Sequence, residues 1–318
     1  MRLKLIPEGT HVDFFRYVRF WVIASAVGVL LSIALLPTRG LNYGVDFRGG
    51  SLILAEIPEP HDIAEYRALL EGLNVGDVAV TEASGGSGAG QVVLMRLGIA
   101  GDDPDAQAAV VGSVQDALTA AYPGIDFLQV DSVGAKVSGE LVESGILAVV
   151  LSFVGIGIYV WLRFEWQFAL GAVASLVHDA IVTAGIFSIL QLEFNLTIIA
   201  AILTVLGYSI NDTVVVFDRV REVLRKYKKM PLRDVMNLAL NETLSRTVMT
   251  STTTLIALFA ILFFGGPVVW GFAFAVIFGV VCGTYSSIYV ASAVVLYFGV
   301  KRDWAQKADT KPGRRARA

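Results

Sequence analysis

The stretch VLGYSINDTVVVFDRVRE, residues 205–222, decides how this chain folds, because it places polar and acidic residues inside an apolar run. The run turns polar at Ser209, Asn211, Asp212 and Thr213, becomes apolar again, and ends in alternating charges. An Asp at the centre of a membrane-spanning helix costs about 2.5–3.5 kcal/mol on the insertion scale. A chain that tolerates this cost is expected to use the carboxylate, so Asp212 is the first candidate functional residue.

The composition is that of a membrane protein. Of the 318 residues, 55% are hydrophobic and only 17% are charged, less charge than a soluble chain of this length carries. The single cysteine, Cys282, lies in an apolar run and excludes an internal disulfide. The sequence has no CxxC, HExxH, P-loop or GxSxG pattern, and three histidines offer little material for a metal site. We therefore expect no metal, no cofactor and no enzymatic activity.

Six apolar runs are each long enough to cross a bilayer, which takes about 20 helical residues. They lie near 20–36, 144–162, 168–190, 194–217, 247–264 and 268–297. The flank of the first run, LLPTRGLNYG (35–44), lacks a small-residue cleavage site, so this run is expected to be a retained signal anchor. The other five runs form one block after a gap of about 100 residues.

The basic residues predict the orientation, because Lys and Arg collect in cytoplasmic loops. Twenty of the 25 basic residues fall on the side that holds both ends of the chain. We therefore expect five regions in order: a cytoplasmic N-terminal segment (1–19), a first span (20–36), an outside domain (37–138), a block of five transmembrane helices (139–300) with a cytoplasmic loop at 218–246, and a basic cytoplasmic tail (301–318).

The outside segment reads as a folded α+β domain. It holds five basic and fourteen acidic residues, and this net negative charge argues against nucleic-acid binding. Strand and helix patterns alternate along it, at 51–57 (strand), 61–73 (helix), 77–82 and 91–97 (strands around the Gly- and Ser-rich loop 83–90), 104–122 (helix) and 125–133 (strand). This βαββαβ order predicts a ferredoxin-like fold.

Polar residues inside three spans form the candidate site. On a helix, Asp212 shares a face with four residues at i−8, i−4, i−1 and i+3, namely Thr204, Tyr208, Asn211 and Val215. The fifth run offers Arg246, which can approach Asp212 from the cytoplasmic side, on one face with Thr250, Thr253 and Thr254. The third run contributes His178 and Asp179 near its midpoint.

The chemistry that these groups offer is proton transfer. A carboxylate held between burial and a nearby arginine can load and release a proton as the helices rearrange. His178 and Asp179 would then relay protons or organise water. Simpler roles remain open: the threonines can serve helix packing, and Arg246 can extend to the membrane surface.

Five stretches together resemble the SecF subunits of the SecD/SecF protein-export family, within the RND transporter superfamily. They are YGVDFRGGSLI (43–53), VGAKVSGEL (133–141), SLVHDA (175–180), GYSINDTVVVFDRVRE (207–222) and NETLSRTVMTSTTTL (241–255). With the order of the spans, the resemblance covers nearly the whole chain. One departure is Ala135, where many relatives have proline.

The resemblance implies a fold, a partner and a function. The fold is a polytopic α-helical membrane protein with six transmembrane helices, half of an RND-type protomer, and one periplasmic ferredoxin-like domain. Because RND halves meet at a shared working site, a heterodimer with SecD is implied. The pair would act beside the SecYEG channel and YajC in the bacterial inner membrane. It would use the proton motive force to pull and release secreted precursors, although sodium replaces the proton in some relatives.

The resemblance also implies roles for particular residues. Asp212 and Arg246 match the coupling residues of the family. Asp46, Gly49 and Gly50 match its DFxGG motif. For the two glycines, the simpler reading is a tight turn between the first span and the domain.

Three rival functions remain open on the sequence. An RND-type exporter of a small molecule or lipid would share the proton relay, but it usually has twelve spans and two outside domains in one chain. An intramembrane aspartyl protease would use Asp179 and Asp212, but SIND replaces the GxGD that such enzymes show. A passive scaffold for the channel would leave the carboxylate at Asp212 without a role.

Overall fold

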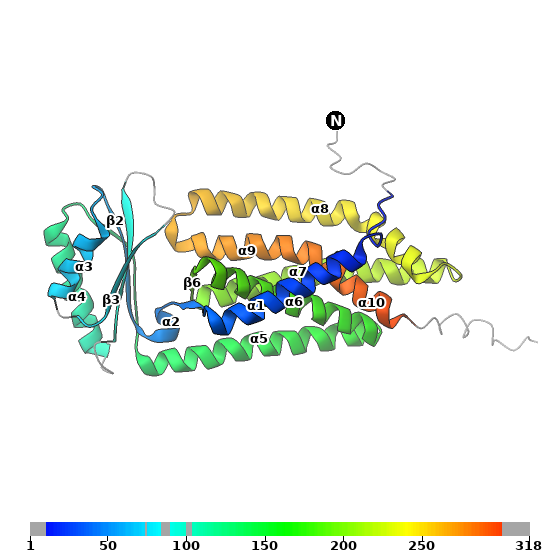
Figure 1. The fold of residues 1–318 in the computed structure, drawn as a ribbon, viewed down its shortest axis with the longest axis horizontal. Coiled ribbons are helices and arrows are strands. Elements are labelled where there is room, and N and C mark those ends of the chain that lie inside the picture. The colour runs from blue at the N-terminus through cyan, green and yellow to red at the C-terminus, as the bar shows by residue number, and fades with distance from the viewer. Residues whose placement is uncertain (1–10, 74, 84–89, 100–103, 301–318) are drawn as a thin grey trace, which may run out of the picture.

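The computed structural model describes residues 11–73, 75–83, 90–99 and 104–300. The first ten residues of the expected N-terminal segment, most of the glycine-rich loop and the basic tail (301–318) lie outside the described residues. The described chain forms a helical bundle with a small α+β domain at one end (Figure 1).

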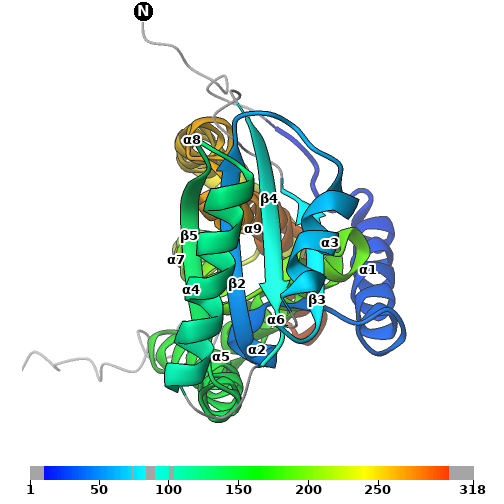
Figure 2. The same cartoon turned by 90° about the vertical axis from the view of Figure 1, so that its left-hand side faces the viewer.

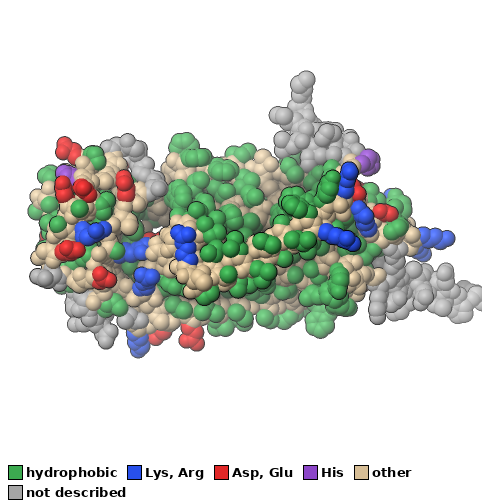
Figure 3. Space-filling model, in the orientation of Figure 1, with side chains coloured by type: hydrophobic (Ala, Val, Ile, Leu, Met, Phe, Trp, Pro, Cys, Tyr) green, Lys and Arg blue, Asp and Glu red, His purple; other side chains and the backbone are tan. Residues whose placement is uncertain are grey.

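Within the described residues, six helices are long and apolar enough to cross a membrane, which confirms the expected number of spans. They are α1 (Val18–Thr38), α5 (Ala135–Arg163), α6 (Trp166–Leu190), α7 (Leu196–Lys226), α8 (Leu232–Phe264) and a last helix in three parts. That helix runs from α9 (Pro267–Ser286) through a π-helical turn, η1 (Ser287–Ala291), into α10 (Ser292–Phe298). Apolar side chains cover the outside of the bundle along its length (Figure 3), as a surface that faces lipid requires.

The helices are longer than the apolar runs that revealed them. The segment 218–246, expected to be a cytoplasmic loop, is mostly helical, because α7 continues to Lys226 and α8 begins at Leu232. Only a short turn ending at Pro231 joins them. Hydrophobic residues continue along both helices past the expected spans and pack α7 against α8. Arg219 Nε on α7 forms an ion pair of 2.6 Å with Glu242 on α8. The basic residues of this hairpin interrupt the apolar runs, which is why the sequence indicates a loop where the helices continue.

The α+β domain has the predicted ferredoxin-like topology. Its strands are β2 (Gly50–Ile57), β3 (Val78–Glu82), β4 (Gln91–Leu97) and β5 (Asp126–Val133), and its helices are α3 (Ile63–Gly72) and α4 (Pro104–Ala121). The sheet order is β3-β4-β2-β5, and every neighbouring pair is antiparallel. In β2, Ile53 pairs with Met95 on one side and Val130 on the other. This order places β2, which follows the first span, at the centre of the sheet.

Helices α3 and α4 cover the sheet face that points away from the bundle (Figures 1 and 2). Alternate strand residues fill the core between them, where Ile53, Tyr66 and Met95 are fully buried. The opposite face carries a smaller apolar cluster, Val45, Leu52, Leu54 and Val92, on the side of the bundle. The domain therefore has its own core and presents its second face to the helices.

Three short elements that the sequence patterns did not predict join the domain to the bundle. Strand β1 (Asn42–Tyr43) pairs in parallel with β6 (Glu193–Phe194), which lies in the turn between α6 and α7. The single-turn helix α2 (Val45–Arg48) follows β1 and leads into β2. The start of α1 and the end of α10 lie at the opposite end of the bundle (Figure 1). The domain therefore meets the α6–α7 turn at the end of the bundle that is far from the start of α1 and the end of α10.

Candidate functional site

Asp212 lies on the buried face of α7 and is 8% exposed. The Thr247 hydroxyl, on α8, donates a hydrogen bond of 2.6 Å to its Oδ1. The Ser287 hydroxyl, at the start of η1, donates one of 3.1 Å to its Oδ2. A carboxylate buried among helices needs such donors, because an unsatisfied charge there is strongly destabilising. The three helices α7, α8 and α9–η1 therefore meet at Asp212.

Asp179, on α6, is completely buried and has three polar neighbours. His178 Nδ1 lies 3.0 Å from its Oδ1. The hydroxyls of Ser209 and Ser286 donate to its Oδ2 at 2.7 and 2.8 Å. Sequence reasoning predicted that His178 and Asp179 lie inside a span, and the structure places the two side chains in direct contact.

Adjacent serines connect the two carboxylates. Ser286 donates to Asp179 and Ser287 donates to Asp212, and both serines are fully buried. The helix changes from α to π geometry between them, at the start of η1. Single π turns inside α-helices are rare and occur frequently at functional sites. Because neighbouring residues on a helix point about 100° apart, Ser286 reaches Asp179 on α6 and Ser287 reaches Asp212 on α7.

The structure corrects the predicted face of Asp212. Thr204 and Asn211 are exposed on the outer side of α7, whereas Asp212 faces inward with Val205, Ser209 and Val216. The reason is geometric, because each helical residue turns the side chain by about 100°, so neighbours in sequence occupy different faces. Asn211 and Asp212 therefore do not act on the same side of the helix.

The structure also changes the expected role of α8. Thr250 and Thr253 donate to backbone oxygens of their own helix, and Thr247 is the residue that contacts Asp212. Arg246 is exposed, and among the described residues no ion pair joins it to Asp212. Arg246 directly precedes Thr247 on α8, so its positive charge lies near the Asp212 contact.

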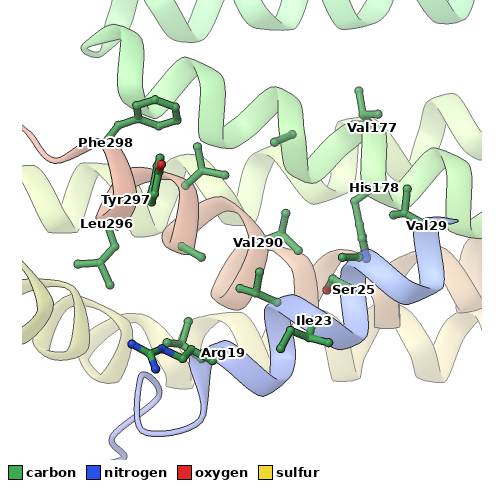
Figure 4. Close-up of a pocket in the computed structure, with 16 residues that line it drawn as sticks. Arg19, Ile23, Ser25, Val29, Val177, His178, Val290, Leu296, Tyr297 and Phe298 are labelled. Atoms are coloured by element: carbon green, nitrogen blue, oxygen red, sulfur yellow. The ribbon is translucent and has the colours of Figure 1, made fainter.

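His178 also forms part of a large groove on the side of the bundle. A cavity of about 820 Å³ lies between α1, α6 and α10, and His178 and Ser25 line its wall (Figure 4). Most other lining residues are apolar, among them Ile23, Val29 and Val290. The His178 ring therefore lies between this apolar groove and the buried carboxylate of Asp179.

The DFxGG residues lie at the junction of domain and bundle. Asp46 is in α2, and its Oδ2 accepts a hydrogen bond of 2.8 Å from the backbone nitrogen of Leu196, the first residue of α7. Gly49 and Gly50 have φ angles of +74° and +106°. A Cβ at Gly50 would lie 2.2 Å from the carbonyl oxygen of Leu97, so only glycine fits there.

Sequence reasoning missed four residues that hold the carboxylates: Ser209, Thr247, Ser286 and Ser287. Ser209 was noted only as a polar residue of the stretch at 205–222. Thr247 follows Arg246 directly, and the serine pair interrupts an apolar run in the sequence TYSSIY (284–289). Consecutive serines within a span were the available signal, because buried hydroxyls in lipid need polar partners.

Six spanning helices, one ferredoxin-like domain after the first of them, and buried carboxylates held between helices define an RND-type membrane subunit. Two family models match: one described as protein export membrane protein SecD/SecF, C-terminal, over residues 113–301, and the SecD/SecF GG motif over residues 34–57. The chain belongs to the SecD/SecF family.

Similar proteins agree with this assignment. The protein translocase subunit SecF of Cereibacter sphaeroides is 54% identical, covering 98% of this chain and 97% of the relative. The subunit SecF of Ketogulonicigenium vulgare is 49% identical, covering 98% and 96%. In Brucella abortus, the similar protein is a SecDF chain, 40% identical, of which this chain covers 39%.

Among solved structures, the SecDF of Thermus thermophilus, a translocon-associated membrane protein, superposes with a TM-score of 0.79 at 33% identity. The match covers 91% of this chain and 39% of that one, so this chain spans about two fifths of a SecDF chain. A super-membrane-facing form of SecDF gives a TM-score of 0.68. The chain is thus an accessory subunit of the Sec translocase type and not a small-molecule or lipid exporter.

Proposed function

We propose that this chain is a proton-driven, non-enzymatic subunit that promotes the translocation and release of secreted precursor proteins on the outer side of the bacterial inner membrane. In this arrangement both chain ends are cytoplasmic and the ferredoxin-like domain is periplasmic. The basic residues of the α7–α8 hairpin and of the flanking segments support this orientation.

The observation that carries the proposal is the way the Asp212 carboxylate is held. Its hydrogen-bond donors are the hydroxyls of Thr247 and Ser287, and among the described residues no ion pair joins it to Arg246. A hydroxyl donates to an ionised carboxylate and accepts from a protonated one, so these partners suit both forms. A direct ion pair with arginine would favour the ionised form alone. The site therefore suits a carboxyl group that gains and loses a proton.

A proton supplies enough energy for such work. Each elementary charge that crosses 100 mV yields about 2.3 kcal/mol. Protonation of Asp212 removes the charge to which Thr247 and Ser287 donate, so it weakens contacts that join α7 to α8 and to η1. A change in the protonation of Asp212 would therefore shift the equilibrium between helix arrangements with and without these contacts.

We propose that SecD completes the site as a heterodimeric partner. Asn211 and Arg246 lie exposed on α7 and α8, next to Asp212 but facing away from it. Exposed polar groups inside membrane spans are unfavourable against lipid and favour a protein partner. The SecDF relatives, in which one longer chain includes the counterpart of this one, support the pairing. SecYEG, YajC and the emerging precursor would be further partners in the translocase.

The test is precursor release in cells depleted of the native protein and supplied with Asp212→Asn. Asparagine keeps the shape of the side chain and cannot exchange a proton. If the variant reaches normal membrane levels and associates with SecD but fails to release a secreted precursor, the proposal stands. Release at the wild-type rate would favour a passive scaffold. Repeating the assay in sodium-free medium separates proton from sodium coupling.

A further inference from the structure

The N-terminus of α7 is held by a residue from outside the helix. Asn195 caps the helix locally, because its Oδ1 accepts a hydrogen bond of 3.2 Å from the backbone nitrogen of Ile198. Asp46, 150 positions earlier in the chain, accepts from Leu196 at 2.8 Å. A carboxylate at this position satisfies a free backbone donor and interacts favourably with the helix dipole. The helix that carries Asp212 is thus fixed at its outer end by the segment that leads into the domain.

A second contact reaches the same turn from the sheet. Arg96, on β4, forms an ion pair of 3.0 Å with Glu193 and donates a hydrogen bond of 2.9 Å to Asn42. The side chains of Arg96 and Glu193 are only 19% and 20% exposed. A partly buried ion pair restricts the relative position of its two side chains more than a solvent-exposed pair does. Glu193 belongs to β6, so this contact holds the turn just before α7.

Close packing makes the junction tight. The backbone nitrogen of Gly44 donates to the carbonyl of Phe194 at 2.9 Å, and the Phe47 ring stacks on the Phe194 ring with centroids 6.0 Å apart. A Cβ at Gly44 would lie 2.6 Å from Glu193 Oε1. We call residues 42–50, together with Arg96 and the turn 191–196, the domain junction.

The junction and Asp212 lie on one continuous helix. Sixteen residues separate Leu196 from Asp212 in α7, about 24 Å at 1.5 Å per residue. On the other side, α2 ends at Arg48, and only Gly49 separates it from the central strand β2, which begins at Gly50. Beside the junction, a cleft of about 350 Å³ separates the sheet from the bundle, with Leu54 and Trp270 on its two sides. The sheet is therefore attached to α7 at the junction and has free space next to it.

We propose that Asp46 is a positioning residue that, together with the Arg96–Glu193 ion pair, transmits the movement of α7 to the outer domain. This inference rests on the proposed function, in which protonation of Asp212 moves α7. A displacement of α7 along its axis by one residue, about 1.5 Å, breaks a hydrogen bond of 2.8 Å unless α2 follows. Because Val45 of α2 is buried in one apolar cluster with Leu52 and Leu54 of β2, α2 and β2 move together. The domain then follows the helix.

The test compares two substitutions of Asp46 in the complex with SecD, reconstituted into vesicles with the Sec channel. Asp46→Asn keeps an oxygen that accepts from Leu196, and Asp46→Ala does not. We expect Asp46→Ala to slow precursor release about fivefold, the change that one N-cap contact supplies, and Asp46→Asn to stay within about twofold of wild type. Hydrogen exchange at the Leu196 amide should be faster in Asp46→Ala alone.

Proton flux distinguishes transmission from a structural role. We expect Asp46→Ala to keep SecD association and Asp212-dependent proton flux into the vesicles while release falls. Wild-type release in Asp46→Ala, or loss of both flux and release, would overturn the inference. The charge reversals Arg96→Glu and Glu193→Arg should each slow release, and the double reversal should restore part of it.

The outcome for Asp212→Asn separates this inference from the proposed function. If Asp212→Asn blocks release while Asp46→Ala does not, only the role of Asp46 is overturned. If Asp212→Asn releases precursor normally, proton coupling through Asp212 fails, whatever Asp46→Ala does.

Discussion

At the scale of single residues, the two buried carboxylates differ in their surroundings. Asp179 is fully enclosed and has three polar neighbours, one of them His178. Asp212 has two hydroxyl donors and the charge of Arg246 nearby. The fixed set of partners around Asp179 suits a group that positions α6, α7 and α9. The smaller set around Asp212 suits a group whose proton exchanges.

Thr247 is expected to be required for the function of Asp212. Thr247→Val keeps the shape of the side chain and removes the hydroxyl that donates to Asp212. A hydrogen bond to a charged group contributes about 1.5–3 kcal/mol, so precursor release should slow about tenfold or more. Thr250→Val is the matched control, because that hydroxyl donates only to backbone oxygens of α8. Equal release rates in the two variants would contradict the assignment.

The sequence identified the carboxylates but not their partners. Asp212 and Asp179 could be predicted because a carboxylate in a membrane span is costly wherever it points. Their donors were not predicted, because the pair Ser286–Ser287 signals a polar contact but does not show which helix each side chain reaches. The error over Asn211 arose from grouping residues too broadly on one helix face.

At the scale of single elements, the junction between α2 and β2 depends on two glycines. Gly50→Ala is expected to destabilise the chain by about 1–3 kcal/mol or more, because φ is +106° and the methyl group would meet Leu97. Gly72→Ala, in α3, meets nothing within 4 Å and should be neutral or stabilising. Thermal unfolding of the two variants in detergent measures the difference. A Gly50→Ala variant as stable as wild type would show that the junction is not tight.

The segment before α1 packs on α8 through Phe14 and Phe15, and the carboxylate of Asp13 adds polar contacts to this attachment. The Asn237 amide donates a hydrogen bond of 2.8 Å to Asp13, and Arg233 forms an ion pair of 3.2 Å with it. The hydrogen bond from Asn237 is the main reason that the pKa of Asp13 lies below its usual value of 3.8, and Arg233 lowers the pKa further. A lowered pKa means that the contribution of ionised Asp13 to this attachment is present above pH 3.8 and is lost as the pH falls through the lower folded-state value.

Hydrogen exchange of residues 13–17 between pH 7 and pH 3, corrected for the intrinsic exchange rate, measures this attachment. We expect protection that declines only below pH 3.8 in the wild type. Asp13→Asn should show weaker protection at every pH and no such decline. Protection in wild type that falls already between pH 6 and pH 5 would point to a group other than this carboxylate.

Element length limited what the sequence could show. The helices α5 to α9 and the strands β2 to β5 are long enough for apolar periodicity to reveal them. Strands β1 and β6 have two residues each and α2 has four, too few for any period to repeat. These three elements form the domain junction, so the contact between domain and bundle became visible only in the fold.

At the scale of the whole molecule, the chain is a bundle with two different kinds of exposed surface. Leu147 and Leu162 on α5 are apolar and more than half exposed, as a surface against lipid requires. The exposed side of α7 and α8 also has apolar residues such as Met249 and Ile256, but it carries in addition the polar side chains of Thr204, Asn211, Arg246 and Thr253. Helix α8 and helix α5 lie on opposite sides of the bundle (Figure 1). The polar side is thus the one that we expect to face SecD.

A cysteine at the polar side tests this arrangement. Asn211→Cys, combined with single cysteines along the spans of SecD, is expected to form an oxidative cross-link between the two chains, because a heterodimer buries the exposed face of α7. The control is Val154→Cys on α5, where Val154 is 51% exposed. The two positions lie at a similar depth, because Arg163, the last residue of α5, pairs with Asp218 of α7. Both variants are made in a chain whose Cys282 is replaced by alanine.

The two positions give opposite expectations for one arrangement of the complex. If α5 faces lipid, the thiol of Val154→Cys has no partner thiol, and this variant should run as a monomer on denaturing gels. The Asn211→Cys variant should instead run at the mass of the cross-linked pair. Cross-linking from Val154→Cys alone would place SecD against α5 and leave Arg246 facing lipid. An arginine at that depth has no partner against hydrocarbon, so this outcome would require the α8 side to be covered by another subunit.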